Sequence, residues 1–116
     1  MSTCADALNH LKSEYPFDRM REYWQDPEDQ EACHKIEQGY DALIAGLIEI
    51  GPDAPDARKI ACFKKAIAVT NDHDGVIETG EREDICALTN RITGACGLEP
   101  DQYGGGEGLA SEWRNW

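Results

Sequence analysis

The sequence lacks several features that would assign the chain to a functional class. No apolar run is long enough to cross a bilayer, and the first six residues do not form a basic segment followed by an apolar one, as a secretory signal would. No nucleophile elbow or HExxH motif occurs, and Gly104-Gly105-Gly106 lacks the preceding strand that a phosphate-binding loop requires. We therefore expect a cytoplasmic protein that is not an enzyme and does not contact a membrane.

Basic residues are scarce. The chain has 11 Lys and Arg against 23 Asp and Glu, which gives a formal net charge of -12. Phosphate backbones are bound by clustered Lys and Arg, so the charge argues against nucleic acid as a ligand. The same charge would attract a basic protein surface and accelerate its encounter, although solubility alone also explains an acidic surface.

The cysteines show no metal-binding or disulfide pattern. There are five, an odd number, and no two of them form a CxxC pair for zinc: Cys4, Cys33, Cys62, Cys86 and Cys96. Most of them occupy apolar positions of predicted helices, where Cys acts as a small hydrophobic residue. The pattern predicts reduced thiols in a cytoplasmic protein, without a cofactor or a structural metal.

What is present indicates one folded helical domain over residues 1–116. An apolar fraction of 41% and a charged fraction of 29% are typical of a globular chain, and 116 residues enclose one modest core. No alternating run is long enough for a sheet. The fold class is therefore predicted to be all-α, a compact bundle of four main helices with a short helical N-terminal segment and a Trp-containing C-terminal tail.

Helix boundaries are marked by caps and breakers. Thr3 predicts the start of a first helix that ends near Tyr15-Pro16, and Phe17 to Trp24 has the spacing of a short amphipathic helical segment that plugs the core. Asp26-Pro27 predicts the start of a long helix that ends at Gly51-Pro52. Its apolar positions are Cys33, Ile36, Tyr40, Leu43, Ile44, Leu47 and Ile48. Gly39 and Gly46 within it indicate close packing or a local break.

The second half continues the same pattern. After Pro55, one helix carries Ile60, Phe63, Ala66, Ile67 and Val69, and we expect Arg58, Lys59, Lys64 and Lys65 on its opposite face, as an internal counterpart to the acids. Thr79 is the predicted N-cap of a further helix that carries Ile85, Leu88 and Ile92 and ends at Gly97. The tail is expected to dock through Trp113 and Trp116.

Two motifs resemble metal sites. The stretch Thr70–Glu81 places Asp72, Asp74, Gly75 and Glu81 at EF-hand loop positions, but Thr70 replaces the first Asp ligand. The acids at its end are equally explained as the start of a helix. Glu31 and His34 have the Glu-x-x-His spacing of di-iron bundles, but the second copy that such a site requires is absent.

Three motifs follow one another in the last third of the chain: Thr79-Gly80-Glu81-Arg82-Glu83-Asp84-Ile85-Cys86, then Gly97-Leu98-Glu99, then Gly108-Leu109 and Trp113. In this order they resemble an uncharacterised bacterial family of small helical proteins, a domain of unknown function. The chain departs from that family at Ala87-Leu88-Thr89, where bulky aromatics are common, and in a Gly-rich insert before Gly108. The resemblance implies a helical fold and a bacterial, cytoplasmic protein, and it transfers no catalytic residue.

Two hypotheses for function follow. The first is a small acidic binding protein, an immunity-type inhibitor that neutralises a basic bacterial toxin domain, such as a nuclease, by protein–protein contact. Its predicted partner-binding residues are the acids of one loop and helix start: Asp72, Asp74, Glu78, Glu81, Glu83 and Asp84. The alternative is a calcium- or metal-binding module that uses the Thr70–Glu81 loop.

Overall fold

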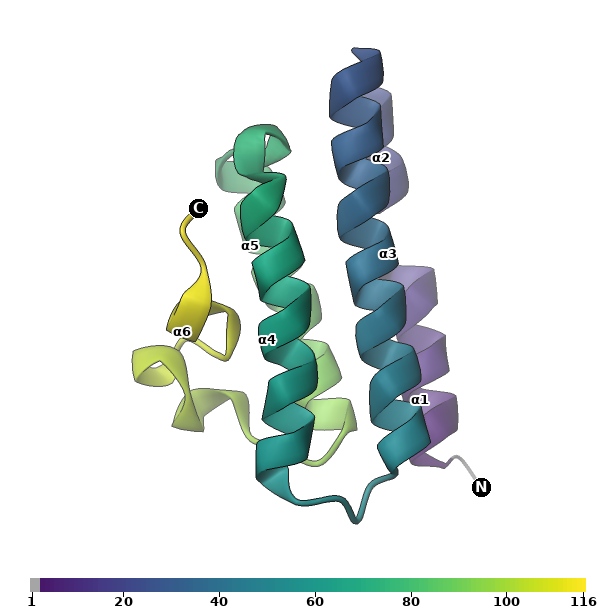
Figure 1. Ribbon diagram of the computed structural model, residues 1–116, viewed down its shortest axis with the longest axis vertical. Coiled ribbons are helices and arrows are strands. Elements are labelled where there is room, and N and C mark those ends of the chain that lie inside the picture. The colour runs from purple at the N-terminus through teal and green to yellow at the C-terminus, as the bar shows by residue number, and fades with distance from the viewer. Residues whose placement is uncertain (1–2) are drawn as a thin grey trace.

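A computed structural model describes residues 3–116 and shows an all-α protein, with no strand in the part described. Three long helices dominate it, namely α3 (Pro27–Ile50), α4 (Asp56–Asp72) and α5 (Thr79–Ala95) (Figure 1). Two shorter helices precede them: α1 (Cys4–His10), which continues into the 3-10 turn η1 (Leu11–Glu14), and α2 (Phe17–Tyr23). The remaining elements are the 3-10 turns η2 (Asp74–Val76), η3 (Pro100–Gln102) and η4 (Gly104–Gly106) and the four-residue helix α6 (Ala110–Trp113).

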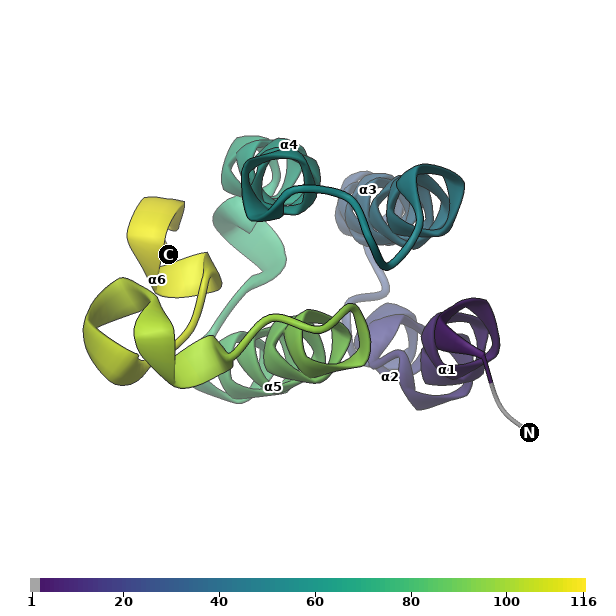
Figure 2. The same cartoon turned by 90° about the horizontal axis from the view of Figure 1, so that it is seen from below.

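The helices pack in two rows. Helices α3 and α4 lie side by side and antiparallel, and α5 lies behind them in the second row together with α2 and α1, which follow each other along α3 (Figures 1 and 2). Because α3, α4 and α5 alternate in direction, α3 and α5 begin at the same end of the molecule, where α4 finishes. The opposite end holds the α3–α4 connection and the last turn of α5.

The predicted helix starts of the first half are confirmed. Thr3 caps α1 through a capping box, in which its hydroxyl accepts a hydrogen bond from the Asp6 amide at 3.1 Å and the Asp6 carboxylate accepts one from the Thr3 amide at 3.2 Å. Asp26 is the N-cap residue of α3, although its side chain makes no capping hydrogen bond, and Pro27 is its first helical residue.

The predicted helix stops are confirmed as well. Gly51 follows α3 with a φ of 81°, and Gly97 follows α5 with a φ of 93°, both in the region that favours glycine. The Leu98 amide donates to the Thr93 carbonyl at 3.0 Å, which is the hydrogen bond of a Schellman motif. Leu98 is buried, so it packs back on the last turn of α5 as the sequence indicates.

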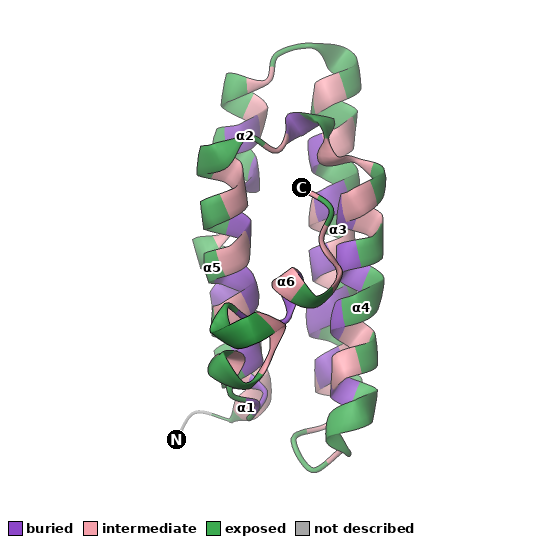
Figure 3. Ribbon diagram, turned by 90° about the vertical axis from the view of Figure 1, so that its left-hand side faces the viewer, coloured by how far each residue is buried: buried purple, intermediate pink, exposed green. Residues whose placement is uncertain are grey.

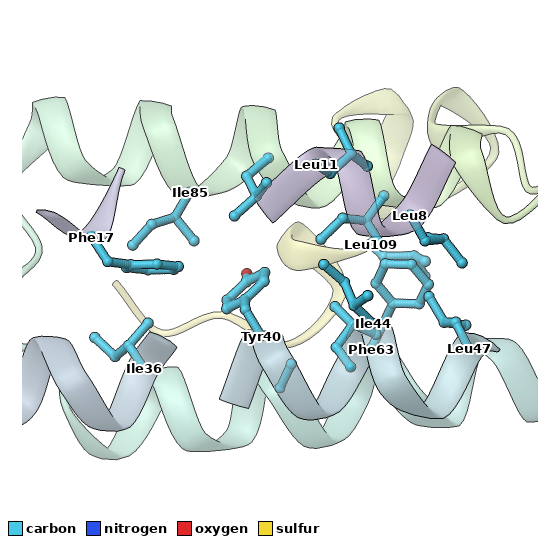
Figure 4. Packing of buried hydrophobic residues seen from close by; sticks show 14 of the residues in the cluster. Leu8, Leu11, Phe17, Ile36, Tyr40, Ile44, Leu47, Phe63, Ile85 and Leu109 are labelled. Atoms are coloured by element: carbon cyan, nitrogen blue, oxygen red, sulfur yellow. The ribbon is translucent and has the colours of Figure 1, made fainter. Parts of the chain in front are cut away.

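The core lies between the two rows and consists largely of the predicted apolar positions. Phe17, Ile36, Tyr40, Phe63 and Ile85 are fully buried within it (Figure 4). The buried Tyr40 hydroxyl lies 2.7 Å from the hydroxyl of Thr89 on α5, so the one polar atom of this large ring is satisfied inside the core.

Gly39 and Gly46 lie where α3 packs on α4. A Cβ atom at Gly39 would lie 3.3 Å from Val69 Cγ1, which is a tight contact, and one at Gly46 would lie 3.4 Å from Cys62 Sγ, which is an ordinary one. Helix α3 continues unbroken through both positions. Close packing therefore explains Gly39, and neither glycine marks a break in the helix.

Two sequence expectations about the elements need correction. The N-cap of α5 is Glu78, one residue before the predicted Thr79, because the Glu81 carboxylate accepts a hydrogen bond from the Glu78 amide at 2.9 Å. Lys59 does not lie on the exposed face of α4 but is 5% exposed.

The C-terminal tail covers the side of the molecule between α4 and α5 (Figures 2 and 3). Its buried anchor is Leu109, which is 0% exposed, whereas Trp113 and Trp116 are half-buried and pack against the core. The Asn71 side chain holds the tail through two hydrogen bonds, to the Trp113 carbonyl at 3.0 Å and from the Asn115 amide at 3.1 Å. Docking thus depends on a leucine and an asparagine as well as on the tryptophans.

Candidate functional site

The six acids predicted to bind a partner lie on a short connection and the helix that follows it. Asp72 ends α4, Asp74 begins η2, Glu78 caps α5, and the other three occupy the first two turns of α5. Val76, which is 1% exposed, anchors this connection in the core and keeps its acids at the surface. Four of the acids are exposed (Asp72, Glu78, Glu83 and Asp84), and Asp74 and Glu81 are half-buried.

Three of the six acids already have a role in the fold. Glu78 and Glu81 form the capping box of α5, in which the Glu81 carboxylate accepts a hydrogen bond from the Glu78 amide. The Asp84 carboxylate lies 3.6 Å from the Arg19 guanidinium of α2, in an exposed ion pair of modest strength. Part of the charge is therefore explained by the fold, and Asp72, Asp74 and Glu83 carry the part that is not.

A second group of acids joins the predicted six. Asp26, Glu28, Asp29 and Glu31 lie at the start of α3, which is the end of the molecule where α5 also starts (Figure 1). Cys33 links the two groups, because its buried thiol is close enough to Asp29 on α3 and to Glu81 on α5 for both carboxylates to raise its pKa. Burial is the largest cause of that raised pKa, and Arg21 opposes it.

We call this end of the molecule the acidic end, and define it as residues 18–37 and 72–84. It holds 13 of the 23 acidic residues and four of the 11 basic residues. One of those basic residues, Arg21, forms ion pairs with Asp18 of α2 and with Glu37 of α3 at 2.5 Å, which raises the pKa of the guanidinium further. The net charge of the acidic end is thus far larger than that of the rest of the chain.

The sequence predicts a helix start at Asp26-Pro27, but it was not predicted that the acids of 26–31 join the site. A signal was available: in a bundle whose consecutive helices alternate in direction, the first and third long helices start at the same end. Helix starts favour acids, so two such starts concentrate negative charge at one end.

The Thr70–Glu81 segment is not arranged as a calcium loop. Thr70 is the third-last residue of α4 and is fully buried, where its hydroxyl donates to the Ala66 carbonyl at 2.8 Å. The Glu81 carboxylate caps α5, and Gly75 does not have the positive φ of a sharp glycine turn. Residues 3–116 contain no group of three or more His, Cys, Asp or Glu side chains placed to hold a metal ion. The calcium hypothesis finds no support in this geometry.

The opposite end holds a buried charge that no sequence pattern predicts. The Lys59 ammonium donates to the carbonyls of Pro52 in the α3–α4 connection, at 2.7 Å, and of Cys96 just after α5, at 2.9 Å. Charged groups are buried only where hydrogen-bond partners compensate for lost water, and two carbonyls do so here. This lysine is a structural tie between three segments, not a counterpart to the acids.

Comparison of the sequence with known protein families and with curated proteins, and of the fold with solved structures, found no match. The resemblance of the last third to small helical bacterial proteins therefore stays a prediction. No helix within residues 3–116 has both the length and the apolar character needed to cross a membrane.

Proposed function

We propose that this chain is a small acidic binding protein, an immunity-type inhibitor that neutralises a basic bacterial toxin domain in the cytoplasm by protein–protein contact. The observation that carries the proposal is the convergence of two acidic stretches, distant in sequence, on one end of the molecule. Helix starts account for part of this charge, and the exposed acids that neither cap a helix nor form an ion pair are the part that supports a binding surface.

The physical basis is electrostatic complementarity. A nuclease active site is positively charged because it must hold phosphates, so a negative surface of matching size can occupy it. Charge of opposite sign on the two partners steers their encounter and raises association rates by about 10- to 1000-fold, an effect that salt weakens. The acidic end supplies such a surface on helices rather than on long mobile loops.

In this proposal the fold acts as a rigid frame. Helices α1 and α2 together occupy the place of the fourth main helix beside α3, α4 and α5, so that a compact bundle presents the acids. The acids that would meet the partner are Asp72, Asp74, Glu78 and Glu83, and those of the α3 start would extend the surface. Glu81 and Asp84 belong to the same surface but also serve the fold through the α5 cap and the Arg19 ion pair.

The experiment begins with the product of the neighbouring reading frame as the first candidate partner, together with affinity capture from the source bacterium. We expect a basic protein whose toxicity is suppressed on co-expression. Association is then compared between the wild type and a variant that carries Asp72→Asn, Asp74→Asn, Glu78→Gln and Glu83→Gln. The variant should associate at least about 10-fold more slowly at low ionic strength, and the difference should shrink as salt is added.

The matched control neutralises four acids outside the acidic end: Glu49, Asp53, Asp56 and Glu99. It changes the net charge by the same amount but leaves the acidic end intact, so its association rate should stay close to that of the wild type. Equal slowing in both variants would show that total charge, not the acidic end, drives association. Unchanged rates in both would contradict the proposal.

A further inference from the structure

Two of the five thiols meet at the end of the molecule opposite the acidic end. Cys4 is the first residue of α1, and Cys96 directly follows the last residue of α5. The Cys4 thiol donates to the Ala95 carbonyl at 3.3 Å, and the Cys96 thiol donates to the Thr93 carbonyl, also at 3.3 Å. Both sulfur atoms are thus held against the same last turn of α5, although the two residues are 92 positions apart in the sequence.

Covalent geometry limits the distance between them. Within a planar trans peptide, the carbonyl oxygen of one residue lies about 2.8 Å from the Cα of the next. The Ala95 oxygen is 3.3 Å from Cys4 Sγ, so the Cα of Cys96 lies within about 6 Å of that sulfur. Disulfides join residues whose Cα atoms are about 4.4–6.8 Å apart. With the roughly 2.8 Å between Cα and Sγ of Cys4 itself, the two Cα atoms lie within about 9 Å of each other, so forming the bond requires α1 to move toward the end of α5 by at most a few ångströms. The Cys4 thiol is also near enough to Cys96 to raise the pKa of its thiol.

The remaining thiols are placed differently. Cys33, Cys62 and Cys86 lie on three different long helices, α3, α4 and α5. Cys86 shares α5 with the turn that precedes Cys96, but ten helical residues separate them by about 15 Å along the axis. The Cys4–Cys96 pair is therefore the one that hydrogen bonds bring to a common turn.

We propose that Cys4 and Cys96 form a dithiol modification site, which a small-molecule disulfide of the glutathione class oxidises to an intramolecular disulfide. The proposal does not depend on the proposed function, because the pair lies at the other end of the molecule from the acidic end. All five cysteines are free thiols in this structure, which is the reduced form.

The order of the two steps follows from exposure. Cys4 is half-buried and Cys96 is 3% exposed, so the Cys4 thiolate reacts first. It attacks one sulfur of oxidised glutathione, forms a mixed disulfide and releases one glutathione as a thiolate, which takes up a proton. The Cys96 thiolate then attacks the Cys4 sulfur and releases the second glutathione. Two protein thiols are oxidised and one glutathione disulfide is reduced.

The test uses the full-length reduced protein, incubated under native conditions with oxidised glutathione, alkylated and digested with trypsin without reduction. Trypsin separates the cysteines: Cys4 is alone in 1–12, and Cys96 is alone in 92–114. We expect a cross-linked peptide of 1–12 with 92–114 as the main disulfide product. Because the bond closes a long loop, the oxidised protein should melt on the order of 10 °C higher than the reduced protein, and a reductant should reverse the shift.

Cys4→Ser is the principal variant, because it alters a half-buried residue at a helix start and leaves the core intact. It should abolish both the cross-linked peptide and the rise in melting temperature, whereas the control Cys62→Ser should abolish neither. A stable glutathione adduct at Cys4 without the cross-link would overturn the proposal. So would a native product in which Cys62 or Cys86 forms disulfides as readily as the pair does.

Discussion

The two ends of this helical molecule treat charge in opposite ways. At the acidic end, 13 acids face four basic residues, most of the charge is at the surface, and only part of it is engaged in caps and ion pairs. At the opposite end, the single ammonium of Lys59 is buried and donates to two backbone carbonyls. The fold requires the charge of Lys59 for its hydrogen bonds, whereas it does not require the surface acids that have no cap or ion pair. A binding function is therefore to be sought among those surface acids.

The largest expected effect comes from removing the buried charge. Lys59→Met keeps the length of the side chain but leaves the Pro52 and Cys96 carbonyls without a donor, so we expect the free energy of unfolding to fall by about 2–4 kcal/mol. Urea denaturation measures it. Lys64→Met, an exposed lysine of the same helix, is the control and should stay within about 0.5 kcal/mol of the wild type. If both substitutions lowered the free energy of unfolding equally, Lys59 would not be a charge that the fold specifically requires.

Alkaline pH should lower the free energy of unfolding, because buried ionisable groups lose protons more easily in the unfolded chain. Burial raises the pKa of the Cys96 thiol next to Lys59, and burial likewise raises the pKa of the Tyr40 hydroxyl in the core. The unfolded chain loses these protons at a lower pH than the native protein does. Below the pKa values of the unfolded chain, the free energy of unfolding is therefore unaffected by these groups. It should then fall by about 1.4 kcal/mol per pH unit for each such group, from about pH 9 for the thiol and about pH 10 for the tyrosine.

Melting temperatures measured between pH 7 and pH 11 test this loss of stability. Tyr40→Phe should flatten the slope above pH 10, at the cost of the hydrogen bond with Thr89. If stability falls with pH equally steeply in this variant and in the wild type, groups other than Tyr40 cause the loss of stability at alkaline pH.

Within the acidic end, the cap of α5 is the feature expected to stabilise the fold. Glu81→Ala removes the acceptor of the Glu78 amide and a negative charge near the helix start, so unfolding should become easier by about 1 kcal/mol. Glu83→Ala, two residues further along α5 and exposed, should cost clearly less. A larger loss for Glu83 would reverse our division of these acids into capping and free groups.

The smallest effect on stability is expected from the acids that neither cap a helix nor form an ion pair. A variant that neutralises Asp72, Asp74 and Glu83 removes repulsion between like charges, so its melting temperature at low ionic strength should equal or slightly exceed that of the wild type. Added salt should reduce any difference. A marked destabilisation would mean that these three acids support the fold, and would argue against their role in a binding surface.

Local signals in the sequence predict much of the fold because they act within a few residues. Thr3, Asp26 with Pro27, and Gly97 with Leu98 each mark one helix end, and each end is predicted from residues next to it in the sequence. Thr79 is the predicted cap because Thr is a preferred capping residue. The side chain of Glu81, which reaches back to Glu78, decides the position.

Contacts between residues far apart in the sequence could not be predicted from such local signals. The burial of Lys59 depends on the Cys96 carbonyl, 37 residues further along the chain, and periodicity alone placed this lysine with the exposed bases of α4. The acidic end likewise depends on the relative direction of α3 and α5. Six of its acids were identified from their density in sequence, but the α3 acids join them only in three dimensions.

The tie at Lys59 lies at the base of the helix whose other end carries the acids. The ammonium joins the α3–α4 connection to the residue that follows α5, so it holds one end of a helix about 25 Å long. Buried residues along α5, together with Val76 before it, hold the rest of the helix against the core. If the acidic end binds a partner as proposed, a stiff helix that is anchored at its far end and along its length would keep the acids in fixed positions.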